Sequence, residues 1–166
     1  MMMRKRRTML RGVCKASLVL IVFLLSGLSE GCAMGAFDRL VLFSEVHGTV
    51  LKDGQPVQGA ELVQTVVWSE NENEIPPQQT TTDARGMFHF APIERKAGLR
   101  RMIPSQPAML QKIVIHYQGT EYIAWRYGKD SYDANSELDG KPINLVCELT
   151  RAPGHEGTHY GICKAV

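Results

Sequence analysis

Residues 153–163 read PGHEGTHYGIC and contain the spacing His-Glu-x-x-His, in His155, Glu156 and His159. In zinc peptidases this spacing lies on a helix, where positions i and i+4 share a face. Two imidazoles then bind one zinc ion, and the intervening glutamate activates the zinc-bound water. These residue types therefore raise the hypothesis of a zinc-dependent hydrolase.

The residues around this motif do not favour a helix. Pro153 and Gly154 precede it, Gly157 lies inside it and Gly161 follows it, and glycine is a poor helix former. Seven residues follow His159, which leaves little room for the downstream third ligand of such peptidases. We expect a polar loop here, with no catalytic residue, no bound metal and no cofactor.

The chain has four cysteines, Cys14, Cys32, Cys147 and Cys163. The last two lie far from the N-terminal segment, and in an oxidising compartment such a pair predicts a disulfide. It would close a loop of about sixteen residues and stabilise the fold by about 3 kcal/mol. In a reducing compartment, Cys147 and Cys163 with His155 and His159 would instead make an acceptable zinc site. The predicted export of the protein argues against that alternative.

The first 35 residues have the pattern of a secretory signal peptide. Six Lys and Arg residues lie between Arg4 and Lys15 with no acid among them, and residues 16–28 are uncharged and rich in leucine. This apolar run is shorter than the roughly 20 residues of a membrane-spanning helix. We therefore expect an exported, periplasmic product with a domain over residues 37–150 and a C-terminal tail over residues 151–166.

The segment GLSEGCAMGA allows three interpretations of how the chain is processed. Cys32 directly after Gly31 resembles the end of a lipoprotein signal, in which that cysteine is lipidated and anchors the protein to a membrane. Ordinary cleavage after Gly35, with Ala33 as the other small residue, would release a soluble product and is slightly favoured. Translation from Met34 would make a cytoplasmic protein but leaves the basic and apolar leader unexplained.

The charge of the chain changes when the leader is removed. Residues 1–35 hold six of the 19 Lys and Arg and one of the 17 Asp and Glu, so the formal net charge falls from +2 to about −3. Nucleic-acid binding needs clustered Lys and Arg, and the densest cluster belongs to the leader. We therefore expect no nucleic-acid partner, and about 130 residues suffice for one domain.

From residue 37 onward, β-rich runs alternate with turns. Residues 39–52 are rich in aliphatic and β-branched side chains, and the Asp53-Gly54 dipeptide favours a tight turn into a return strand within residues 55–70. Residues 94–110 contain helix-tolerant residues and two prolines, and are expected to form a short helix or a long loop.

The later strands complete the predicted fold. Phe88 and Phe90 are two residues apart and are expected to share one buried face. Residues 111–127 predict a hairpin that turns at Gln118-Gly119, and residues 143–149 a last strand. About seven strands, with at most one short helix, indicate an antiparallel, immunoglobulin-like β-sandwich.

Two stretches resemble the carboxypeptidase regulatory-like, transthyretin-like sandwich. That family repeats a G-x-V strand, a G-x-P-x-x-G-A turn and a T-D-x-x-G-x-F-x-F strand pair. The matching residues are Gly48, Val50, Gly54, Pro56, Gly59, Ala60, Thr82, Asp83, Gly86, Phe88 and Phe90. The remainder is similar to a group of small uncharacterised bacterial proteins with this sandwich. The resemblance implies a fold and a binding or accessory role, and no activity.

Charged stretches and scattered histidines supply the other candidates. Arg95, Lys96, Arg100 and Arg101 form a basic patch that could meet an acidic partner or lipid headgroups. His47, His89 and His116 fall in predicted strands, where a histidine is more often exposed than catalytic. No Ser-His-Asp grouping or phosphate-binding glycine loop is recognisable, so we expect no enzyme.

We therefore expect a non-enzymatic exported binding module that acts on another protein, such as an immunity protein against a periplasmic effector. The first alternative is an envelope accessory protein, anchored through Cys32, that binds carbohydrate or lipid. The second is a zinc-dependent hydrolase built on His155, Glu156 and His159.

Overall fold

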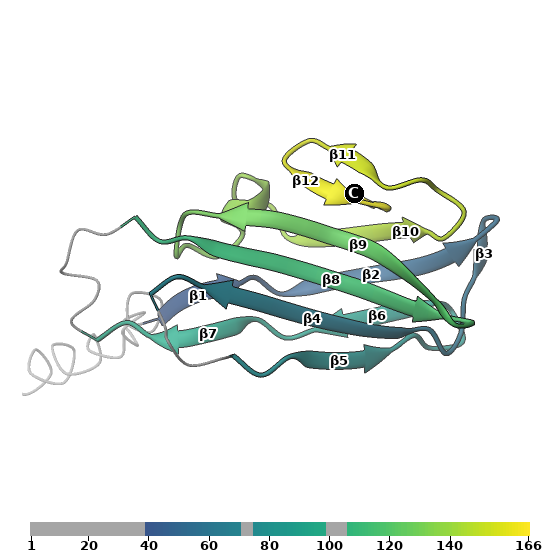
Figure 1. The fold of residues 1–166 in the computed structure, drawn as a ribbon, viewed down its shortest axis with the longest axis horizontal. Coiled ribbons are helices and arrows are strands. Elements are labelled where there is room, and N and C mark those ends of the chain that lie inside the picture. The colour runs from purple at the N-terminus through teal and green to yellow at the C-terminus, as the bar shows by residue number, and fades with distance from the viewer. Residues whose placement is uncertain (1–38, 71–74, 99–105) are drawn as a thin grey trace, which may run out of the picture. The chain divides into compact units, whose positions relative to one another are not determined.

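The computed structural model describes residues 39–70, 75–98 and 106–166 (Figure 1). Residues 36–166 form one compact unit, distinct from residues 1–35. The expected signal peptide and the lipidation candidate Cys32 lie outside the described residues. Within the described ranges, no helix is long and apolar enough to cross a membrane.

The described residues form thirteen strands and one 3-10 helix. The strands are β1 (Arg39–Phe43), β2 (Val46–Lys52), β3 (Gln55–Pro56), β4 (Glu61–Trp68), β5 (Gln78–Thr81), β6 (Met87–Phe90), β7 (Ile93–Lys96), β8 (Met109–Tyr117), β9 (Thr120–Lys129), β10 (Ile143–Glu148), β11 (Gly154–Glu156), β12 (His159–Gly161) and β13 (Cys163–Ala165), and the helix is η3 (Ser136–Leu138). The predicted all-β sandwich is confirmed, although several short strands raise the strand number above seven.

One layer of the sandwich is a six-stranded antiparallel sheet in the order β11-β12-β9-β8-β4-β5. The strands β8 and β9 form its long central hairpin, which confirms the hairpin predicted over residues 111–127. Gln118 (φ 51°) and Gly119 (φ 76°) both have left-handed backbones. Two such residues make the tight turn whose twist matches that of the flanking strands.

The other layer is a sheet in the order β13-β10-β2-β3, in which β6 also pairs with β2. Its strands β2 and β10 run parallel, whereas the sequence predicted antiparallel pairing throughout. Antiparallel neighbours are favoured where a short hairpin joins them. Since β2 and β10 lie far apart in the chain, no hairpin imposes that direction on them.

The turn after β2 forms as predicted, but the return strand does not pair with β2 over its length. Asp53 (φ 52°) and Gly54 (φ 74°) make the tight turn, and Glu148 of β10 accepts hydrogen bonds from both of their backbone N–H groups, at 2.9 and 3.0 Å. Only the two residues of β3 then pair with β2. A bend at Gly59 (φ 76°) sends the chain into β4, in the other sheet.

Residues 94–110, expected to be a short helix or a loop, begin and end in strands. Ile93–Lys96 is β7, which pairs antiparallel with β1, and Met109 begins β8; residues 99–105 lie outside the described residues. Ile93 and Ala97 are buried. Pairing with β1 and the burial of these two side chains therefore outweigh the local helix tendency of this segment.

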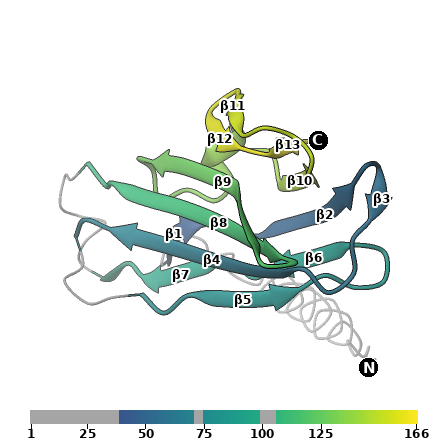
Figure 2. The ribbon, with the colours of Figure 1, turned by 45° about the vertical axis from the view of Figure 1, so that its right-hand side comes forward.

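The hydrophobic core lies between the two layers, with the six-stranded sheet over β1, β2, β6 and β7 (Figures 1 and 2). Its fully buried apolar side chains include Trp125, Phe43, Leu40, Leu42, Leu62, Met109, Ile113, Ile115, Ile143 and Leu145. Phe88 and Phe90 are buried too, with ring centroids 6.0 Å apart, so their predicted shared face is confirmed. Gly48 lies opposite Phe88 in the ladder and leaves room for its ring.

Residues 151–166 differ from the polar tail that was expected. They form β11, β12 and β13, of which β13 pairs with β10 and β12 pairs with β9. The predicted disulfide joins Cys147 of β10 to Cys163 of β13, directly opposite in the ladder with Cα atoms 4.0 Å apart. Ile162 is buried as well, so the segment contributes to the core that orders it.

Candidate functional site

The His-Glu-x-x-His motif forms a β-hairpin, so the helix that the zinc-peptidase hypothesis requires is not formed. His155 pairs with Tyr160, and Glu156 pairs with His159. Since successive residues of a strand point to opposite faces, the two histidines of the motif project in opposite directions. Cys147 and Cys163 are joined to each other, which removes them as thiolate ligands for the alternative zinc site.

His159 is instead part of the core. Its ring stacks on Trp125 with centroids 4.1 Å apart, and its Nε2 donates to the Cys163 carbonyl at 2.9 Å. Burial lowers the pKa of His159, which the hydrogen bond to Cys163 opposes only in part. The neutral ring therefore has a packing role. A cavity of about 380 Å³ adjoins it, between residues 138–142 and residues 156–159.

A buried polar network lies close by, at the C-terminal end of β9 and around the carboxylate of Glu137; Thr158 Oγ1 donates to the Glu137 carbonyl at 3.1 Å. Its Oε2 accepts hydrogen bonds from Lys129 Nζ and Ser44 Oγ, both at 2.8 Å. Its Oε1 accepts from Gln111 Nε2 at 2.7 Å and from the backbone N–H of Ser44 at 3.1 Å. The Lys129 and Glu137 side chains have no exposed surface, so the network anchors the segment between β9 and β10 and is closed to a ligand.

The pKa values in this network follow from burial and pairing. Burial raises the pKa of Glu137, but the hydrogen bond and charge of Lys129, with the Gln111 hydrogen bond, outweigh burial and lower it. Burial lowers the pKa of Lys129, and the contact with Glu137 opposes this only in part. The ionised pair thus depends on both partners being present.

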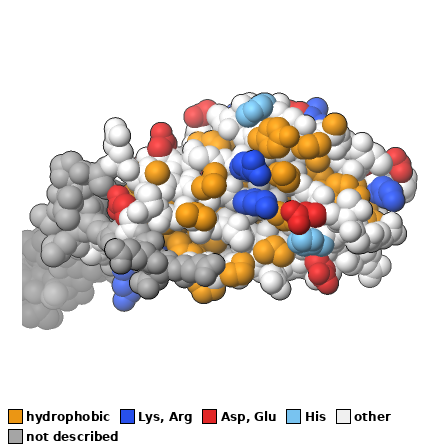
Figure 3. All heavy atoms as spheres, in the orientation of Figure 1, with side chains coloured by type: hydrophobic (Ala, Val, Ile, Leu, Met, Phe, Trp, Pro, Cys, Tyr) orange, Lys and Arg blue, Asp and Glu red, His pale blue; other side chains and the backbone are white. Residues whose placement is uncertain are grey.

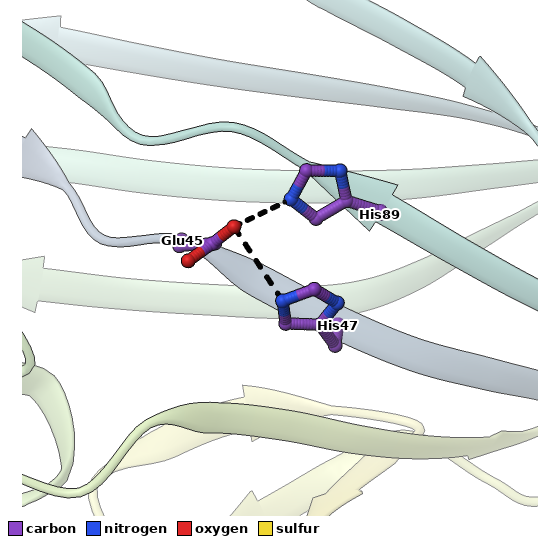
Figure 4. A group of neighbouring side chains, drawn as sticks. All are labelled: Glu45, His47 and His89. Carbon is purple, nitrogen blue, oxygen red and sulfur yellow. Dashed lines mark hydrogen bonds and ion pairs between the residues drawn. The ribbon is translucent and has the colours of Figure 1, made fainter.

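A second group of titratable side chains is exposed and brings together residues that the sequence left scattered. His47 of β2 lies directly opposite His89 of β6, and their rings stack with centroids 4.5 Å apart. Glu45 Oε1 accepts a hydrogen bond from His89 Nε2 at 2.7 Å and lies 3.5 Å from His47 Nε2. Figure 4 shows both rings turned toward this carboxylate. We call these three residues the Glu45 cluster.

The local sequence positions the side chains of the Glu45 cluster. Val46 and Phe90 are buried, so the pleat turns His47 outward from β2 and His89 outward from β6. Glu45, which directly precedes β2, is exposed beside them. The hydrogen bond from His89, the largest effect, holds the pKa of Glu45 below its ordinary value, with a smaller contribution from the charge of His47. The alternation in E-V-H and F-H-F predicts the outward direction of each residue, but only the β2–β6 pairing predicts their contact.

The predicted basic patch is described only in part. Arg95 and Lys96 lie on β7, and Arg95 Nη1 donates to the Glu94 carbonyl at 2.9 Å. Arg100 and Arg101 lie outside the described residues. His116, the third histidine that the sequence predicts in a strand, is exposed on β8.

The outer face of the six-stranded sheet carries rows of apolar and basic side chains. Val67 and Leu110 lie opposite each other and are 66% and 53% exposed. The next row on this face pairs Lys112 with Arg126. Beyond it lies a second apolar row, made by Val63, Val114 and Ile123. Figure 3 shows this face, with hydrophobic side chains gathered around a pair of basic ones. We call these three rows the sheet face.

Comparison with known proteins places the chain in a family but assigns no activity. Residues 46–152 match the model of a domain of unknown function, DUF6795. No curated protein matches the chain. The matched residues run from the start of β2 to just beyond β10 and include two residues of the Glu45 cluster, His47 and His89. Because the match covers more than half of the chain, this protein belongs to the DUF6795 family.

Proposed function

We propose that this protein is a non-enzymatic, exported binding module that acts by contacting another protein through the sheet face. The observation that carries the proposal is the exposed pair Val67 and Leu110. Large apolar side chains that are neighbours on an exposed surface are typical of protein interaction sites.

The charges of the sheet face support a partner of complementary chemistry. The basic row of Lys112 and Arg126 lies between the two apolar rows, and Lys112 Nζ is 3.8 Å from Glu121 at its edge. A partner with apolar side chains flanking an acidic group would complement this pattern. Arg95 and Lys96 of β7 belong to a different sheet and would form a separate contact.

The test uses cross-linking in the cell that makes the protein. A photo-reactive phenylalanine analogue is placed at residue 110, and at residue 87 as control, because Met87 is an exposed apolar residue of the other sheet. We expect a specific adduct from residue 110 alone. Binding of the purified partner should then weaken by roughly tenfold or more in the Val67→Lys, Leu110→Lys double variant and remain unchanged in Met87→Lys. Equal adducts from both positions would contradict the proposal.

One specific form of this function is an immunity protein that neutralises a toxic effector in the periplasm. The leader pattern of residues 1–35 and the cross-strand disulfide support an oxidising compartment. An effector encoded next to this protein should lose its toxicity when the protein is co-expressed, and the Val67→Lys, Leu110→Lys variant should fail to protect. Protection by that variant would count against this form.

The alternative is an envelope accessory protein anchored through Cys32, which follows Gly31 as in a lipoprotein signal. Cells are grown with a fatty-acid analogue, and the protein is isolated and examined for label. Label that disappears in Cys32→Ala would support the anchor. If the protein carries no label and appears in the same cell fraction as the Cys32→Ala variant, the anchored alternative is wrong and the soluble form is supported.

The resemblance to the carboxypeptidase regulatory-like sandwich belongs to the same proposal. The contacts of its turn residues support it: Thr82 Oγ1 accepts from the Ala60 N–H at 2.9 Å, and Asp83 Oδ1 accepts from the Arg85 and Met87 N–H groups at 2.8 Å. Gly86 (φ 73°) closes the turn. Such sandwiches serve as binding modules, which agrees with the function proposed here.

A further inference from the structure

We propose that the Glu45 cluster is a binding site for a divalent transition-metal ion of the zinc class. Its three ligand atoms, one carboxylate oxygen and two imidazole nitrogens, lie within 4.8 Å of one another. They converge on the outward face of the β2–β6 ladder: His47 and His89 form one pair of this ladder, and Glu45 directly precedes β2 (Figure 4). This site is separate from the sheet face, which lies on the other layer.

The ligand types select the metal. Imidazole nitrogen suits zinc, copper and nickel, whereas magnesium and calcium require a shell of oxygen atoms. Zinc bonds to histidine and carboxylate ligands are about 2.0–2.2 Å long, so neighbouring ligand atoms on one tetrahedral ion are about 3.3 Å apart. The Glu45 oxygen lies 2.7 Å from His89 Nε2 and 3.5 Å from His47 Nε2, values on either side of that separation. Small rotations of the three side chains would therefore admit the ion.

The backbone beneath the cluster is rigid, whereas its side chains are free to adjust. His47 and His89 form one pair of an antiparallel ladder, and the next pairs, Val46 with Phe90 and Gly48 with Phe88, face the core. Burial of the two phenylalanine rings holds the register of the ladder. The side chains of the cluster are about half exposed, so they can rotate onto an ion without disturbing the core. Sites built on strands keep their ligands in place better than sites built on loops.

Three protein ligands leave one tetrahedral position open to water. Without metal, His89 Nε2 donates a hydrogen bond to Glu45, as in any histidine–glutamate pair. The difference is that a metal site uses both histidines and the carboxylate together. Removing any one of the three must therefore weaken the binding of the ion.

The test is a calorimetric titration of the full chain with zinc chloride, which measures the affinity and the number of ions bound. Every sample carries Cys14→Ser and Cys32→Ser and no polyhistidine tag, so that free thiols and tag residues do not bind the ion. We expect one zinc ion per chain, and no binding of magnesium chloride at the same concentration. The His47→Ala and His89→Ala variants should lose zinc binding, and Glu45→Gln should bind roughly tenfold more weakly or worse.

Matched controls are His116→Ala and His155→Ala, which remove exposed strand histidines outside the cluster and should leave zinc binding unchanged. Zinc should also shift the imidazole proton resonances of His47 and His89 but not those of His116. Unchanged thermal unfolding without zinc would show that the variants fold. The proposal is overturned if the chain binds no zinc, if His47→Ala and His89→Ala bind it as the unsubstituted chain does, or if the control variants lose it equally.

Discussion

Lys129 and Glu137 form an ion pair without solvent contact, with Nζ 2.8 Å from Oε2 and both side chains fully buried. The pair joins the end of β9 to η3, within the connection that leads to β10. Glu137 also receives hydrogen bonds from Ser44 and Gln111. One carboxylate therefore links the residue that follows β1, the central hairpin and a connection that contains no strand.

We predict that Glu137→Gln destabilises the protein by about 3–5 kcal/mol, because it leaves the Lys129 charge buried and unpaired. Urea unfolding followed by tryptophan fluorescence measures the loss, since Trp125 lies in the core. The matched control is Glu121→Gln, which removes the partner of Lys112 from a largely exposed pair 3.8 Å apart. It should cost less than about 1 kcal/mol. Equal losses in the two variants would contradict a special role for the buried pair.

Acid should destabilise the protein in part through Glu137. The pKa of this group is lower in the folded chain than in the unfolded chain, because Lys129 and Gln111 favour its ionised form against burial. Its contribution to stability is therefore complete above the unfolded pKa and is lost as the pH falls through the folded one. Unfolding free energies measured from neutral to acidic pH should fall less steeply in Glu137→Gln than in the unsubstituted chain. Parallel curves would exclude this contribution.

We predict that Gly48→Ala destabilises the fold by about 1–3 kcal/mol through overpacking. A Cβ at this position would lie 2.5 Å from Phe88 Cζ and 3.0 Å from the Leu145 carbonyl oxygen. Gly128→Ala is the control, because Gly128 has open space around its Cβ position and no positive φ. Thermal unfolding should separate the two, and adding Phe88→Leu to Gly48→Ala should recover part of the loss.

Replacing Cys147 and Cys163 by alanine should lower the free energy of unfolding by about 3 kcal/mol. The fold should survive, because β13 also pairs with β10 through backbone hydrogen bonds and Ile162 is buried. Circular dichroism reports the retained sheet, and urea unfolding reports the loss. Mass spectrometry of the untreated protein should find no free thiol at either position. Two free thiols there would count against the disulfide and against export.

Local chemistry explains what could be predicted from the sequence. Asp53-Gly54 and Gln118-Gly119 form tight turns in which all four residues have left-handed backbones. Glycine adopts this conformation without steric cost, so the dipeptide itself favours the turn. The alternation of Phe88 and Phe90 predicts a buried face because the pleat has a period of two residues. A pair of cysteines far from a segment that has the pattern of a signal peptide likewise predicts a disulfide. Each of these features involves only a few neighbouring residues and can be recognised in the sequence. Together they predict strands and turns, and therefore the all-β class.

Contacts between distant segments were decided only by the tertiary structure. The transfer of β4 to the other sheet and the parallel pairing of β10 with β2 depend on how whole strands bury their faces, which no single stretch encodes. The antiparallel pairing of β6 with β2 likewise brings His89 beside His47 and Glu45. The sequence KDSYDANSELDGKP is mostly polar, yet Lys129 and Glu137 within it are buried, because each charged group supplies the partner that makes burial of the other tolerable.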